Sequence, residues 1–146
     1  MATTHDDEWA EATKASAPAT LRVLLYSDHV EARQQVLAAV GRTVAADLPD
    51  VEWFETATAQ ATIDAVDAGG FDLLVLDGEA GKAGGMGLAR QFKDEIFQCP
   101  PVLLLTGRPQ DAWLASWSAA DATVCRPIDP FELQEAVAGL LRGRSA

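Results

Sequence analysis

Short apolar runs recur along the chain, and a segment with a different spacing of apolar residues follows each of them. The runs cover residues 21–28, 71–77, 101–106 and 122–127, and residues 51–55 form a further strand-like stretch. Near-continuous apolar runs of this length are typical of strands buried on both faces, as in a parallel sheet covered by helices. The pattern therefore predicts five strands in one parallel sheet.

The segments between the strands carry apolar residues at helical spacing. The first helix opens near Asp28, whose short side chain can cap it, and ends either at Gly41 or after Leu48. Further helices are predicted at residues 59–68, 86–97, 109–119 and 130–141. A strand followed by a helix, five times over, predicts an α/β fold: a doubly wound five-stranded parallel sheet in a (βα)5 three-layer sandwich.

One domain accounts for most of the chain. We expect a flexible N-terminal tail at residues 1–20, a domain at 21–142 and a C-terminal tail at 143–146. A helix-turn-helix would need two further helices after residue 142, so we expect a stand-alone domain. The apolar set expected to face the core from the last helix is Phe131, Leu133, Val137, Leu140 and Leu141.

The charge of the chain argues against a nucleic acid partner. It has 22 acidic against 11 basic residues and a net charge of −11, whereas phosphate backbones attract clusters of Lys and Arg. The apolar runs are far shorter than the ~20 residues that cross a bilayer, and the acidic N-terminus does not resemble a secretory signal. We therefore expect a cytoplasmic protein that binds neither nucleic acid nor membrane. Cys99 and Cys125 are predicted to be reduced and partly buried.

A polar residue stands at or near the carboxyl end of four predicted strands. These residues are Asp28, Asp77, Thr106 and Arg126. In parallel sheets the carboxyl ends of the strands border a common crevice, so the four side chains are expected to converge there. A carboxylate can attack a phosphoryl donor, a hydroxyl and a cation can stabilise the phosphoryl group, and paired carboxylates can hold Mg²⁺. This set of groups suffices for reversible phosphorylation of an aspartate.

The order of these motifs resembles the receiver domain of two-component response regulators. The resemblance covers residues 21–142 and rests on the motifs at 24–28, 72–77, 104–107 and 119–121, followed by Arg126-Pro127. It implies that Asp77 is the phospho-acceptor, Asp28 a Mg²⁺ ligand and Thr106 the switch hydroxyl. Arg126 falls where the family has a lysine before a proline, and the bond to Pro127 is expected to be cis.

Several positions depart from the family pattern. Ser27 replaces the first of two acids, so Mg²⁺ is expected to bind weakly, and Thr123 replaces the usual switch aromatic. Arg126 presents a planar fork instead of a compact ammonium, and it either pairs with a phosphoryl group or pairs permanently with Asp77. Glu79 either supplies the acid missing at position 27, as a metal ligand beside Asp28 and Asp77, or is a solvated loop acid.

Two tryptophans mark a further surface. Trp113 and Trp117 are four residues apart and share one face of the predicted helix at 109–119. Packing in the core is the simpler interpretation for at least one of them, and an exposed pair would instead anchor a partner. In receivers this helix belongs to the face that contacts partners or a second copy.

Three functions compete for this sequence. The leading hypothesis is a switch that accepts a phosphoryl group at Asp77 from a histidine kinase or a small phosphodonor, with Mg²⁺, and then binds an unknown target protein. The alternative is a pseudo-receiver that binds its partner constitutively. A small metal-dependent phosphatase is disfavoured, because no general base beyond Asp28 and no phosphate-cradling motif is found.

Overall fold

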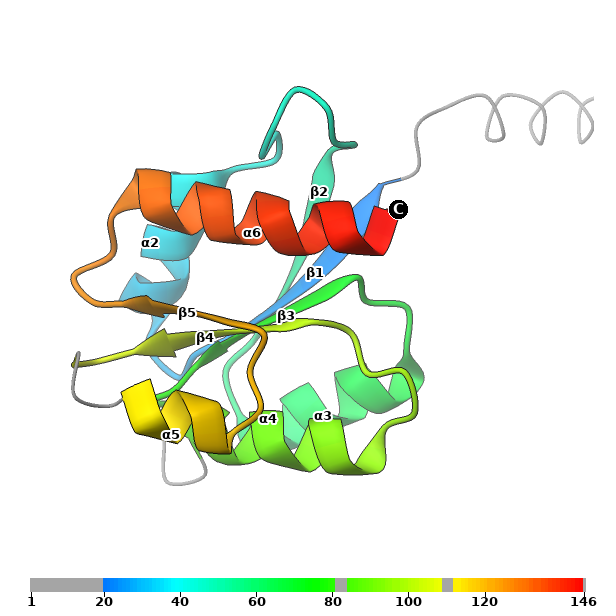
Figure 1. Ribbon diagram of the computed structural model, residues 1–146, viewed down its shortest axis with the longest axis vertical. Helices are drawn as coiled ribbons and strands as arrows, with labels where there is room; N and C mark the ends of the chain where they lie inside the picture. Colours follow the sequence, from blue (N-terminus) through cyan, green and yellow to red (C-terminus); the bar gives the residue numbers. More distant parts are fainter. Residues whose placement is uncertain (1–19, 81–83, 109–111, 146) are drawn as a thin grey trace, which may run out of the picture.

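A five-stranded parallel sheet forms the centre of the molecule (Figure 1). The computed structural model describes residues 20–80, 84–108 and 112–145. Residues 1–19 of the predicted N-terminal tail and Pro109 lie outside these ranges. The strands are β1 (Leu21–Tyr26), β2 (Val51–Thr56), β3 (Leu73–Asp77), β4 (Val102–Thr106) and β5 (Ala122–Cys125). The helices are α2 (Val30–Val40), α3 (Ala59–Ala68), α4 (Gly84–Glu95), α5 (Ala112–Trp117) and α6 (Pro130–Ser145).

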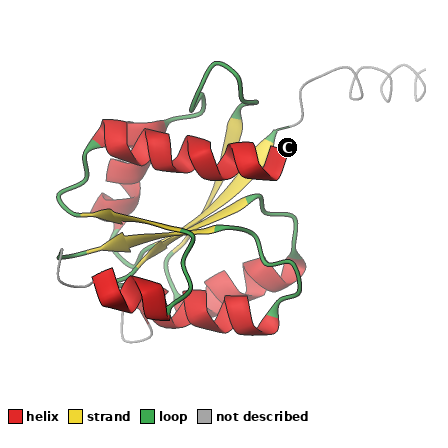
Figure 2. Ribbon diagram, viewed as in Figure 1, coloured by secondary structure: helices red, strands yellow, loops and turns green. Residues whose placement is uncertain are grey.

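The sheet order is β2-β1-β3-β4-β5, so β3 lies in the middle. All four strand pairings are parallel, which confirms the predicted doubly wound (βα)5 sandwich. Helices α2 and α6 cover one face, and α3, α4 and α5 lie on the other (Figures 1 and 2). Among the described residues, no helix is both long and apolar enough to cross a membrane.

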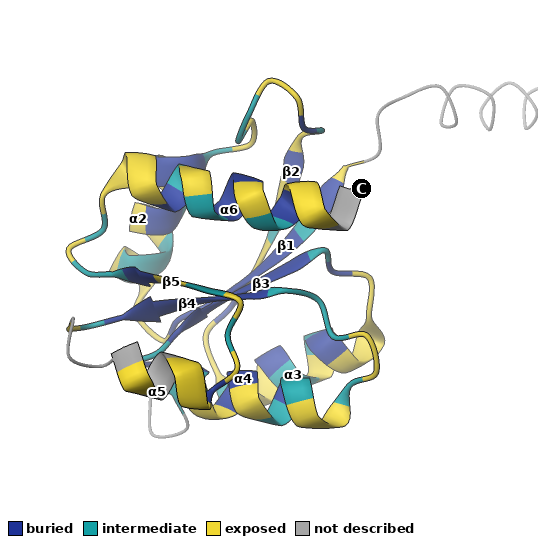
Figure 3. Ribbon diagram, in the orientation of Figure 1, coloured by how far each residue is buried: buried dark blue, intermediate teal, exposed yellow. Residues whose placement is uncertain are grey.

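Alternate residues of the central strands feed two separate cores, because successive side chains of a strand point to opposite faces. In β3, Leu73 and Val75 pack on the α2 and α6 side, whereas Leu74 and Leu76 pack on the α3 and α4 side. The central strands are buried throughout (Figure 3), which explains why they appear as unbroken apolar runs in the sequence.

Several helix boundaries differ from the prediction. Helix α2 ends before Gly41, whose φ of +71° suits a glycine, so the extension to Leu48 is wrong. Its N-cap is His29, whose side chain makes no capping hydrogen bond, so Asp28 is not the N-cap residue. Asp28 lies one residue too early, because the helix begins only at Val30. Helix α6 continues to Ser145, into the segment predicted as a C-terminal tail.

Phe131 does not join the core. It is 68% exposed, whereas Leu133, Val137 and Leu141 of the same helix are fully buried. Residues two positions apart in an α-helix lie about 200° apart around its axis, so Phe131 and Leu133 occupy opposite faces. The two cysteines, Cys99 and Cys125, form no disulfide and are partly buried, as predicted.

Candidate functional site

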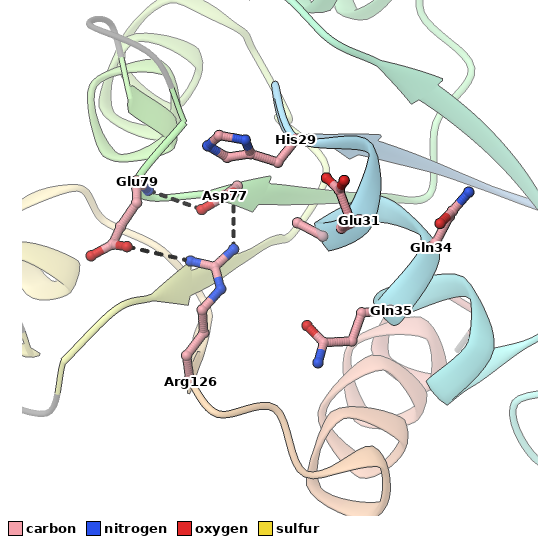
Figure 4. A pocket seen from close by; sticks show the side chains of 8 residues that line it. His29, Glu31, Gln34, Gln35, Asp77, Glu79 and Arg126 are labelled. Carbon is pink, nitrogen blue, oxygen red and sulfur yellow. Dashed lines mark hydrogen bonds and ion pairs between the residues drawn. The ribbon is translucent and has the colours of Figure 1, made fainter.

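A pocket of about 670 Å³ lies beyond the carboxyl ends of β1, β3 and β5 (Figure 4). It is where sequence reasoning placed the crevice. The first turns of α2 form one wall, the residues that follow β3 form another, and Arg126 reaches in from the segment after β5. The lining residues are His29, Glu31, Ala32, Gln34, Gln35, Asp77, Glu79 and Arg126.

Asp77 ends the central strand and is almost completely buried, with 1% of its surface exposed. One carboxylate oxygen, Oδ1, accepts a hydrogen bond from the backbone N–H of Glu79 at 2.9 Å. The other, Oδ2, accepts one from the Ser27 hydroxyl at 2.8 Å and lies 2.9 Å from Nη2 of Arg126. Burial raises the pKa of Asp77. The hydrogen bonds from Arg126, Glu79 and Ser27, together with the positive charge of Arg126, lower the pKa by more than burial raises it. The pKa therefore lies below its ordinary value, and Asp77 is ionised at neutral pH.

Ser27 is a buried partner of Asp77. Tyr26 pairs with Leu76 in the β1–β3 register, so the next residue of β1 falls opposite Asp77. Its hydroxyl donates to Asp77 and accepts the backbone N–H of His29 at 3.1 Å. Sequence reasoning treated Ser27 only as a missing acid, and its role as a donor could have been inferred from the register alone.

Arg126 is held at the edge of the sheet by its backbone. Its N–H donates to the carbonyl of Thr106 at 2.9 Å, which continues the pairing of β5 with β4 beyond Cys125. The bond to Pro127 is cis, as the family resemblance implied. The guanidinium reaches both Asp77 and Glu79, whose Oε2 lies 3.7 Å from Nη1 (Figure 4). Arg126 thus faces the pocket, as predicted.

The remaining predicted site residues surround this group at different depths. Thr106 is buried at the end of β4, one position beyond the register partner of Asp77. Glu79 is about half exposed, and its carboxylate lies over Gly107, where a Cβ atom would collide with it. Asp28 follows β1 on the solvent side, with one carboxylate oxygen 3.6 Å from Nε2 of His29. Unlike Asp77 and Glu79, Asp28 does not line the pocket.

In this arrangement the Asp77 carboxylate faces partners from the chain itself, where a divalent cation would need open oxygen ligands. Mg²⁺ takes oxygen ligands in near-octahedral geometry and is held mainly through carboxylates. Within the described ranges, no three His, Cys, Asp or Glu side chains come together as a group that could hold a metal ion. The Asp77 oxygen that faces Ser27 is already paired with Arg126. Family resemblance and observed geometry therefore disagree on the metal.

Both tryptophans of α5 point to solvent, so the prediction that at least one packs in the core is wrong. Trp113 is 68% exposed and Trp117 51%. A four-residue spacing places them on one helical face, and α5 packs against α4 and β4. Arg90 of α4 lies over the Trp117 ring at 5.8 Å. Thr123 of β5 is exposed too.

Five parallel strands in this order, with a buried carboxylate at the end of the middle strand, define the receiver type of α/β fold. A solved receiver domain of the Francisella response regulator 1452 matches it with a TM-score of 0.72 at 15% identity. That match covers 84% of this chain and 98% of the other. The Vibrio cholerae chemotaxis protein CheY4 matches with a TM-score of 0.67 at 19% identity, over 84% and 99% of the two chains.

The sequence comparison gives the family. An uncharacterized response regulatory protein of Mycobacterium tuberculosis strain H37Rv is 53% identical over 122 residues, which are 84% of this chain and 92% of that protein. No protein-family model matches the chain. Because this identity extends over most of both proteins, the chain belongs to the response regulators.

Proposed function

We propose that this response regulator is a single-domain switch that accepts a phosphoryl group on Asp77 and signals through protein contacts. The observation that carries the proposal is the buried carboxylate of Asp77, which lies at the end of β3 beside a pocket and is paired with Arg126. The Ser27 hydroxyl and the backbone N–H of Glu79 hold it in one orientation, so the nucleophile is positioned before a phosphodonor arrives.

The proposed reaction is a transfer of one phosphoryl group. An Asp77 oxygen forms a bond to phosphorus while the bond from phosphorus to the leaving group breaks, and the leaving group keeps that electron pair. The donor is the phosphohistidine of a histidine kinase or a small acyl phosphate. Asp77 is 1% exposed, so the flexible Arg126 side chain must move for the donor to reach it. In this proposal Arg126 then balances the charge of the phosphoryl oxygens, and the hydroxyl of Thr106 donates a hydrogen bond to one of them.

A pseudo-receiver is the second candidate, and one observation favours it. The ion pair between Arg126 and Asp77 closes the carboxylate to a donor, as a constitutive binding module would permit. This candidate shares the fold and the partner surface and differs only in whether Asp77 reacts. A phosphatase has the least support, because the sequence contains no phosphate-cradling motif, although His29, Glu31 and Glu79 line the pocket beside Asp77.

We further propose that the exposed face of α5 contacts the target protein. Trp113 and Trp117 are large apolar side chains on the surface, and Trp residues are enriched at the centres of interfaces. Exposed Thr123 extends this face on β5. A target protein or a second copy of the chain would bind here. The cytoplasmic location and the weak use of Mg²⁺ stay predictions.

Mass spectrometry after incubation with acetyl phosphate tests the proposed reaction. The full chain should gain one base-labile phosphoryl group, and D77N should gain none. D47N is the matched control, because Asp47 also pairs with an arginine but is exposed. Absence of modification in the wild type, with and without Mg²⁺ and with a histidine kinase as donor, would leave the pseudo-receiver. Release of inorganic phosphate from a phosphoester would instead support an enzyme.

A further inference from the structure

The Asp77 carboxylate has three partners within the chain, two of them on the same oxygen, Oδ2. Its Oδ1 is bonded to the Glu79 N–H, and its Oδ2 is bonded to both the Ser27 hydroxyl and the Arg126 guanidinium. A cation that coordinates Oδ2 must approach the same lone pairs that these donors occupy. Binding of a metal there therefore requires that at least one internal partner leave.

Ser27 helps to keep the Asp77 carboxylate occupied by partners from within the chain. A serine hydroxyl can both donate and accept, and here it donates to Asp77 while it accepts the His29 N–H. A second carboxylate in its place would repel Asp77, and a divalent cation would relieve that repulsion. A neutral hydroxyl creates no such repulsion, so the buried charge at Asp77 needs only one positive charge beside it.

Arg126 supplies that positive charge from a fixed position. Its backbone is bonded to Thr106 on β4, the strand next to Asp77, and its planar fork reaches Asp77 and Glu79 together. With 23% of its side chain exposed, the guanidinium lies between the buried carboxylate of Asp77 and the more exposed one of Glu79. It therefore touches two of the three carboxylates that sequence reasoning assigned to the metal.

We infer that Arg126 is an internal counter-ion that takes the place of a divalent cation at Asp77, so that Arg126 and a metal ion compete for one carboxylate. The inference concerns the same site as the proposed function and deepens it. It predicts that removal of Arg126, rather than addition of a ligand, opens the site to a metal.

Titration with Mn²⁺, followed by electron paramagnetic resonance, measures this competition directly. The R126A protein should bind Mn²⁺ at least about tenfold more tightly than the wild type, because no internal ion pair has to be broken first. If R126A does not fold, R126Q replaces it, since glutamine removes the charge and keeps a donor. R142A is the matched control: it removes the exposed arginine of the Asp47 pair and should leave Mn²⁺ affinity unchanged.

Thermal unfolding gives a second readout that needs no spectroscopic metal. About 10 mM Mg²⁺ should raise the melting temperature of R126A, because a ligand that binds only the folded state stabilises it. The wild type and R142A should shift little. The S27D variant should fall between wild type and R126A, because it adds a carboxylate but keeps the counter-ion.

Equal metal affinity in wild type and R126A would overturn the inference, and so would the absence of binding in both. Neither experiment contains a phosphodonor, so its outcome is independent of whether Asp77 is phosphorylated. Conversely, a wild type that gains no phosphoryl group would refute the proposed function and leave the role of Arg126 as counter-ion intact.

Discussion

Two aspartate–arginine pairs in this molecule have similar chemistry and different surroundings. Arg142 of α6 makes two hydrogen bonds to Asp47, from Nε and Nη2 at 2.8 and 2.9 Å. Arg126 makes one close contact to Asp77, from Nη2 at 2.9 Å. The side chain of Asp47 is 59% exposed and that of Asp77 only 1%.

The comparison shows that burial, not hydrogen-bond geometry, decides how strongly the two charges of such a pair depend on each other. Water and salt screen the Asp47 pair, although its two-point geometry is the better one. Asp77 has almost no water around it, so its charge depends on the residues that face it. Both carboxyl groups have a lowered pKa. For Asp47 the main cause of the lowered pKa is the hydrogen bond from Arg142. For Asp77 the largest single effect is burial, which raises the pKa, and several hydrogen bonds together outweigh it.

Loss of Arg126 should give the largest change in stability. The R126A substitution leaves a buried carboxylate without its counter-ion, and we expect the free energy of unfolding in metal-free buffer to fall by about 2–3 kcal/mol. Urea denaturation of R126A, R142A and wild type measures it. The loss of stability caused by R126A should be smaller in the D77N background, because position 77 then carries no charge to compensate. An equal loss in the D77N and wild-type backgrounds would show that packing of the Arg126 side chain dominates.

Acid should weaken the buried pair next. The pKa of Asp77 is lowered in the folded protein, so its contribution to stability is present above the unfolded pKa and disappears as the pH falls through the folded value. Urea midpoints measured from pH 6 down to below the ordinary aspartate pKa of ~3.9 should fall more steeply for wild type than for D77N. Parallel curves would mean that other carboxyl groups carry the acid sensitivity.

Removal of the Ser27 hydroxyl should have a smaller effect. The S27A substitution removes a buried donor to Asp77 and an acceptor for His29, and we expect a loss of about 1.5 kcal/mol in unfolding free energy. Thr43 is the matched control, because its hydroxyl lies 3.2 Å from Asp50 at the exposed surface. T43A should change the urea midpoint much less than S27A does.

The smallest effect is expected at the exposed pair. R142A and D47N should shift the urea midpoint less than any of the Asp77 or Arg126 variants, because both side chains are solvated in either state. The small difference from wild type should vanish in about 1 M salt, where screening is nearly complete. A loss comparable to that of R126A would contradict the argument that burial separates the two pairs.

The sequence by itself determined the architecture and the edge of the sheet at which the site lies. Strands buried on both faces must be apolar throughout, so β3 and β4 can be recognised as strands from the sequence alone. Parallel strands end at one edge, so the sequence predicted that Asp28, Asp77, Thr106 and Arg126 converge there, and of these four Asp77 and Arg126 line the pocket. The resemblance to receivers rested on the same positions, and the relative that is 53% identical supports the family independently.

The tertiary structure decided which surface each side chain meets. Helical spacing places Trp113 and Trp117 on one face, but only the docking of α5 turns that face to solvent. Phe131 was counted with the core set, yet the buried face of α6 is the one that carries Leu133.

The partners of Asp77 likewise depend on distances that no pattern of residues contains. Ser27 meets Asp77 because β1 and β3 pair in one register, and Arg126 meets it because the backbone after β5 continues along β4. A carboxylate, a hydroxyl and a guanidinium could equally have enclosed a metal ion or a phosphoryl group. When the strands assemble, these groups become buried within hydrogen-bond distance of one another, and they therefore pair with each other instead.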